Sequence, residues 1–243
     1  MRNALDRGRP VRAALLAAIA TLAIWAPGSA AEESEESPQL ERVKASIEGL
    51  GSTSRTADLK RHLEFLGENF QDARPLLEQA IRRGTPRVRA LVVKLYGDHG
   101  NVEEDLETVT GRLNDHSATV RMAAVASVRR LGKEGAPALL RRIGREPDPG
   151  IRKMIIRSLK SWKDPSYIPE LARLLADENH AGVRKHLVTA LEWLSGERFG
   201  DDAEAWLEYS ETYALRESEQ RILEYSRSLT GGENEASERK KKK

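Results

Sequence analysis

A β-branched residue followed at once by arginine recurs along this chain at a nearly constant interval. The four copies are anchored by Val88, Val120, Ile151 and Val183, which lie 32, 31 and 32 residues apart. A fixed period of this length, with helical signals inside it, is typical of a stacked helical repeat. Such a chain shares one elongated core between neighbouring units and is usually built to bind along a surface.

Each repeat is predicted to hold a first helix, a short polar turn and a second helix that begins at the anchor. The first helices, called the A helices, are expected over 73–83, 102–113, 136–143 and 167–175. The second, called the B helices, are expected over 86–96, 118–131, 150–162 and 181–194. Glycines are expected to end three of the B helices: Gly97, Gly132 and Gly196.

The two ends of the solenoid, predicted over 39–196, differ from its middle. Residues 40–66 carry the apolar pattern weakly, as a degenerate first unit would. Residues 197–230 are predicted to be a helical cap in which Trp206, Tyr209 and Tyr213 seal the last open core face. The alternative for these rings is stacking on a sugar or a peptide.

The first 31 residues are predicted to be a secretory signal. Four arginines precede an apolar run over 13–26, and small residues follow, so cleavage is expected after Ala30 or Ala31. Residues 32–38 then form an acidic, disordered leader. We expect a periplasmic or secreted protein, with an uncleaved N-terminal membrane anchor as the alternative. The absence of cysteine suits an oxidising compartment and excludes a disulfide framework.

The final residues, 231–243, are polar and end in a run of lysines. They are predicted to be disordered. This tail could touch anionic lipid headgroups or a cell-wall polymer, or it could serve only to keep the chain soluble.

The hairpins of about 31 residues resemble HEAT repeats, in particular the short bacterial type that is also seen in phycobilin lyases. The resemblance covers 73–194 and implies an all-α, right-handed, armadillo-like α-solenoid of about four clear repeats. In that family the arginine after the anchor commonly joins an aspartate or asparagine in a ladder between units. The resemblance therefore implies a structural role for Arg89, Arg121, Arg152 and Arg184, with Asp115, Asp148 and Asp177 as the acids. The run over 194–206 is similar to the end of exported bacterial HEAT-repeat proteins.

Charge is shared unevenly between the two sets of helices. The B helices, taken over 86–97, 118–131, 149–161 and 181–195, hold twelve basic residues and one acid. The A helices, taken over 71–83, 102–114, 134–144 and 165–176, hold seven basic and eight acidic residues. The resemblance implies that the B helices line the concave face, which would concentrate anionic partners there.

Helical geometry selects the outward positions of that face. The second, sixth and ninth residues after each anchor lie farthest from the core. These positions hold the residues that we predict to bind a partner: Lys94, Arg129, Lys153, Arg157, Lys160 and Lys185. The alternative is a solvated basic surface without a partner.

The predicted function is a non-catalytic, monomeric scaffold that binds a macromolecule on its basic concave face, either an acidic segment of a protein partner or another anionic polymer. No nucleophile with a base and no phosphate loop is apparent, and the five histidines lack the spacing of a zinc site. We therefore expect no catalytic residue, metal or cofactor. Asp201 or Asp202 is expected to cap a helix, with a carboxylate pair for acid–base chemistry as the alternative.

Two alternatives stay open. One is an enzyme of the chromophore-lyase kind, or an accessory subunit of one, which needs a pocket with acid–base residues. The other is binding to the backbone of nucleic acid, which export disfavours. Once the signal's four arginines and one aspartate are subtracted from 40 basic and 38 acidic residues, 36 and 37 remain, so the net charge gives nucleic acid no support.

Overall fold

The computed structural model describes residues 37–241, without the side chains of Glu217, Glu224 and 226–241. The predicted signal, the leader up to residue 36 and the last two lysines lie outside the described residues. The described part is built from helices and contains no strand. None of its helices combines the length and apolarity that a membrane crossing requires.

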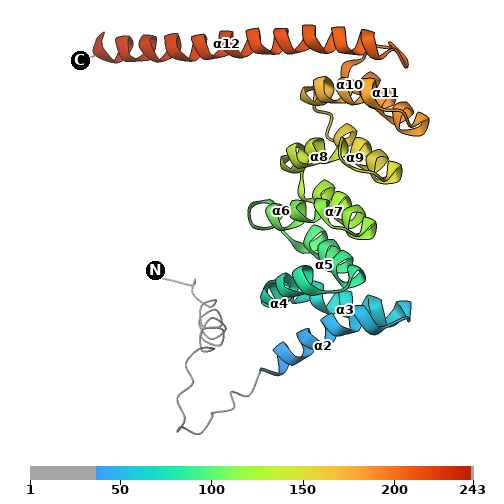
Figure 1. The fold of residues 1–243 in the computed structure, drawn as a ribbon. Helices are drawn as coiled ribbons and strands as arrows, with labels where there is room; N and C mark the ends of the chain where they lie inside the picture. Colours follow the sequence, from blue (N-terminus) through green and yellow to red (C-terminus); the bar gives the residue numbers. More distant parts are fainter. Residues whose placement is uncertain (1–36, 242–243) are drawn as a thin grey trace, which may run out of the picture. The chain divides into compact units, whose positions relative to one another are not determined.

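The helices form successive antiparallel pairs, labelled in Figure 1. A first pair, α2 (Pro38–Ser52) and α3 (Thr56–Glu68), precedes the four repeats predicted from the anchors. The A helices are α4 (Phe70–Arg83), α6 (Val102–Gly111), α8 (Ala136–Ile143) and α10 (Ile168–Asp177). The B helices are α5 (Pro86–His99), α7 (Ala118–Leu131), α9 (Pro149–Ser161) and α11 (Ala181–Ser195). Short 3₁₀ turns adjoin three of the A helices: η1 (Arg112–Asn114), η2 (Lys133–Gly135) and η3 (Pro165–Tyr167).

Each A helix packs against its own B helix, and each B helix packs against the next B helix along the chain. The four anchors, Val88, Val120, Ile151 and Val183, are all buried in one continuous hydrophobic cluster. This sequential packing confirms the predicted all-α solenoid, because every unit buries its apolar face mainly against its neighbours.

Three of the four B helices begin where a side chain satisfies free N–H groups of the first turn, whereas α7, which follows Ser117, has no side-chain cap. Thr85, Asp148 and His180 each accept a hydrogen bond from a backbone N–H in the first turn, at 2.7–3.4 Å. Pro86 and Pro149 follow two of these caps, at positions where a missing N–H costs nothing. These caps therefore set where α5, α9 and α11 start.

Gly97 does not end α5, contrary to the prediction from sequence. The helix continues to His99, and Gly97 is buried inside it. A Cβ atom at this position would lie 2.4 Å from the Ser127 Oγ on α7. The glycine is therefore needed for the close approach of α5 and α7, where the Ser127 hydroxyl donates to the Val93 carbonyl at 2.9 Å. Gly132 and Gly196 do follow the last residues of α7 and α11.

The chain ends in a single long helix, α12 (Ala203–Lys241). Asp202 caps its start by accepting from the N–H groups of Glu204 and Ala205, and the helix packs against α10. Residues 231–241 continue this helix, whereas the sequence predicted disorder from 231 onward. The physical reason is local propensity, because Glu, Ala, Arg and Lys dominate that stretch and all favour helix.

Candidate functional site

The arginine after each anchor bridges two neighbouring units. Its Nε and Nη2 atoms donate to a carboxylate in the turn of the next unit, or, for the last arginine, in the segment before α12. Its Nη1 atom donates to backbone carbonyls at the turn that precedes its own helix. We call each such pair a rung and the four rungs the ladder. The rungs are Arg89–Asp115, Arg121–Glu146, Arg152–Glu178 and Arg184–Asp201, with N–O distances of 2.7–3.2 Å.

Only the first rung uses an acid that was predicted for the ladder, Asp115. Asp148, expected as the second acid, caps α9, and Asp177 lies beside the third rung without joining it. Glu146 and Glu178 take these places. In the first three rungs the acid lies five residues before an anchor and accepts the N–H two residues further on. The register of the ladder is therefore constant once glutamate counts as well as aspartate.

The positive charge of each ladder arginine is neutralised by the carboxylate of its own rung. Glu146 is fully buried and accepts from both Arg121 and Arg142. Burial opposes its charge, but the hydrogen bonds from these two arginines outweigh burial and lower the pKa of Glu146. The pKa of Asp115 is lowered in the same way, since bonds from Arg89 outweigh desolvation. The ladder therefore joins units and leaves little charge for a partner.

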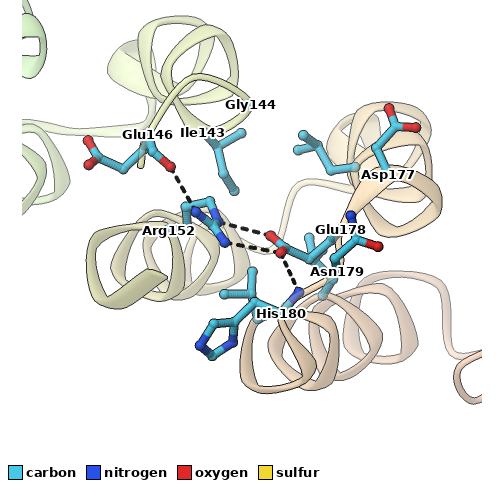
Figure 2. A pocket seen from close by; sticks show the side chains of 11 residues that line it. Ile143, Gly144, Glu146, Arg152, Asp177, Glu178, Asn179 and His180 are labelled. Atoms are coloured by element: carbon cyan, nitrogen blue, oxygen red, sulfur yellow. Dashed lines mark hydrogen bonds and ion pairs between the residues drawn. The ribbon is translucent and has the colours of Figure 1, made fainter. Parts of the chain in front are cut away.

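The third rung lies at a surface pocket between α9 and the start of α11. In Figure 2 the Arg152 guanidinium points at the Glu178 carboxylate, which also accepts from the His180 N–H. His180 uses Nδ1 to accept from the Gly182 N–H, so its ring serves as a helix cap. The Arg152 guanidinium and the Glu178 carboxylate are thus occupied with each other, which points to a structural role for this pair.

The six predicted partner-binding residues fall into two groups. Lys94 donates to Asp98 at 2.5 Å, and the same carboxylate lies 3.2 Å from Arg130 of α7. Asp98 therefore balances the charge on the α5 part of the face. The other five side chains are exposed or half-buried and have no carboxylate partner within residues 37–241: Arg129, Lys153, Arg157, Lys160 and Lys185.

Two features missed from the sequence lie beside this second group. Arg129, Arg130 and Arg157 line one pocket between α7 and α9, together with Ala126, Met154 and Ser158. Trp193 of α11 is 58% exposed, and the ammonium groups of Lys160 and Lys163 lie 5.4 and 5.8 Å from its ring centroid. The repeat position of Trp193 could have indicated its exposure. It stands ten residues after its anchor, and the equivalent positions in α5 and α7 hold the charged residues Asp98 and Arg130.

The aromatic residues of the C-terminal region form an end cap. Trp206 is completely buried and donates from Nε1 to the Gly200 carbonyl at 2.9 Å. Its ring meets Phe199 edge-on at 4.8 Å, and Tyr209 lies next to both. Tyr213 stacks beside Tyr209. A buried ring offers no face to a sugar, and Trp206 packs within the hydrophobic core.

Within the described residues, no three histidine or acidic side chains are grouped closely enough to hold a metal ion. Asp201 accepts from Arg184 in the last rung, and Asp202 caps the start of α12.

Comparison with known families gives one match. The model for HEAT repeats matches residues 73–153 and again 136–222. These two overlapping stretches together cover more than half of the chain and contain all four anchors. No curated protein matches the chain.

Proposed function

Because the chain belongs to the HEAT-repeat family, whose repeats generally mediate protein–protein interaction, we propose that it is a non-catalytic scaffold that binds an acidic segment of a partner protein. The observation that carries this proposal is the group of five basic side chains on α7, α9 and α11, which no described carboxylate balances. We call these five residues, Arg129, Lys153, Arg157, Lys160 and Lys185, the basic face.

The mechanism is recognition by a surface that is already in place. The ladder fixes each unit on the next, so the basic face loses little conformational entropy when a partner binds. Several like charges on one surface also raise the local concentration of an acidic partner and speed encounter. The ladder thus supports binding without taking part in it.

The proposed compartment is outside the cytoplasm. The supporting observations are the four arginines followed by an apolar run within the first 31 residues and the complete absence of cysteine. Processing after Ala30 or Ala31 would leave a chain that contains the whole solenoid.

Charge reversal tests the proposal. We expect the triple variant Lys153→Glu, Arg157→Glu and Lys160→Glu to abolish capture of the partner from an envelope extract, with an unchanged helical circular dichroism spectrum. The matched control reverses three exposed arginines of the A helices, Arg83, Arg141 and Arg173, and so changes the net charge equally. If both triple variants lost capture of the partner equally, net charge alone would determine binding. If the first triple variant captured the partner as well as the wild type does, the basic face would not be the binding surface.

A further inference from the structure

We infer that the affinity of the basic face is concentrated in one two-part site, whose ligand is an acidic peptide segment with an apolar side chain beside its carboxylates. The first part is the pocket lined by Arg129, Arg130 and Arg157, called the arginine pocket. The second is Trp193 with Lys160 and Lys163, called the tryptophan clasp. The inference rests on the proposed function and narrows it to a place and a ligand class.

The arginine pocket suits a carboxylate. Guanidinium groups present paired N–H donors that match the two oxygens of a carboxylate. Arg129 and Arg157 have no carboxylate within the described residues, and Arg130 shares Asp98 with Lys94. Met154 and Ala126 form an apolar wall of the same pocket, where water competes less with a bound anion. Ser158 is not a free donor, since its hydroxyl donates to the Met154 carbonyl.

The tryptophan clasp combines an exposed ring with two cations. Trp193 keeps more than half of its surface in water, although its neighbour Leu191 on the same helix is fully buried. Exposed tryptophans and arginines are the residues that most often carry binding energy at protein interfaces. The two ammonium groups over the ring are placed to meet carboxylates, while the uncovered part of the indole can pack against an apolar side chain.

The turn at the end of α9 sets the position of Lys163 in the clasp. Lys163, just after α9, has φ of 55°, and it is the only non-glycine residue with positive φ in the described chain. Lys163 is the first residue after the C-cap of α9, where a left-handed residue commonly ends a helix, and its N–H donates to the Lys160 carbonyl at 3.2 Å. Here the conformation belongs to the turn that leaves Lys163 beside Trp193.

The two parts lie next to each other on α9. Arg157 of the pocket and Lys160 of the clasp are three residues apart, so their side chains are neighbours on one helix face. The repeat itself does not demand this arrangement. The position of Arg157, six after the anchor, holds Lys94 in α5, Ala126 in α7 and Thr189 in α11. The site is therefore a local specialisation of the last three units.

The cations that lie over the Trp193 indole favour a peptide over an acidic polysaccharide as the ligand. A sugar stacks on an open aromatic face, whereas Lys160 and Lys163 both lie over the Trp193 ring. A peptide can satisfy the cations with side-chain carboxylates and place an apolar side chain at the ring edge.

The test measures binding of two labelled octapeptides to the mature chain by fluorescence anisotropy. One peptide holds glutamate throughout, and the other has leucine at a central position. We expect the leucine peptide to bind more tightly, and Arg157→Gln and Trp193→Ala each to weaken it by about tenfold or more. Trp193→Phe should retain most of the affinity. The preference for leucine should vanish in Trp193→Ala but persist in Arg157→Gln.

The matched control is Lys94→Gln, at the same repeat position as Arg157 but balanced by Asp98. Its affinity should stay within about twofold of the wild type, and all variants should keep the wild-type thermal midpoint. If Arg157→Gln and Trp193→Ala weaken binding no more than Lys94→Gln does, the localised site is wrong, although the basic face stands. If the wild-type chain binds neither peptide, the proposed function itself is wrong. Tighter, Trp193-dependent binding of oligogalacturonate would overturn the peptide as ligand.

Discussion

The second and the last rung of the ladder have their arginine at the same repeat position, but the two ion pairs differ strongly in their exposure to water. In the second rung the Arg121 and Glu146 side chains are 9% and 0% exposed, and Arg142 donates to the same carboxylate. In the last rung Arg184 and Asp201 are 23% and 65% exposed. The donors and the distances are nearly alike, so the difference lies in the water that can reach each pair.

That difference predicts unequal contributions to stability. A buried ion pair that loses one partner leaves a charge without solvent, which is strongly destabilising. An exposed pair exchanges its partner for water and is weakened further by salt. The rungs therefore share one geometry along the solenoid, but each is expected to contribute a different free energy to the stability of the fold.

Removing the acid of the inner rung should have the largest effect. Glu146→Ala leaves Arg121 and Arg142 without their shared carboxylate, and we expect the free energy of unfolding to fall by about 3–5 kcal/mol. Urea denaturation followed by circular dichroism measures this loss. A loss below about 1 kcal/mol would mean that solvent reaches this rung as easily as the last one.

The first rung should be intermediate. Asp115 is 7% exposed and Arg89 is 17% exposed, and no second arginine of the described residues donates to the Asp115 carboxylate. Asp115→Ala is expected to cost about 1.5–3 kcal/mol, the range for hydrogen bonds to charged groups. The same denaturation assay places it between the other two rungs, and a cost equal to that of Glu146→Ala would break the ranking.

Acid should weaken the inner rungs. The pKa of Glu146 is lowered from its ordinary value of 4.5, and that of Asp115 from 3.8. The unfolded chain therefore binds protons first, so this stability is present above about pH 4.5 and is lost as the pH falls through the folded values. Denaturation midpoints between pH 7 and pH 3 should fall more steeply for the wild type than for Glu146→Gln. Parallel slopes would contradict a charged Glu146.

The last rung should contribute least. Asp201→Asn is expected to lower the free energy of unfolding by about 1 kcal/mol or less, and the small loss should shrink further in high salt. Denaturation at two salt concentrations checks both statements. A salt-independent loss comparable to that of the inner rung would show that burial is not what distinguishes the two.

Sequence reasoning predicted the helices well because the apolar period and the anchors are local signals. The B helices begin within a residue of the predicted starts, and a proline or a capping side chain marks three of the four in the sequence. The error at Gly97 arose because the need for a small residue came from Ser127 of another helix, which no local pattern records.

The ladder and the surface were predicted less completely. The arginines followed from the repeat, but the acids did not, because only aspartate and asparagine were considered. Counting five residues back from Val120, Ile151 and Val183 would have found Asp115, Glu146 and Glu178 directly. The balance of Lys94 by Asp98 was visible as an i, i+4 pair. The clasp on Trp193 was not, because it joins two helices through the backbone conformation of Lys163.

The ladder also bears on how such a chain can change in length over evolution. Each rung takes its donor from one unit and its acceptor from the next, so a copied segment of about 31 residues inherits both halves. An added unit would find a matching neighbour on either side without further substitution. The series stops at α12, where Asp201 again lies five residues before a buried residue, Trp206, but Leu207 stands in the place of the next arginine. The series of donors therefore ends with Arg184, because the Leu207 side chain has no N–H group to form a further rung.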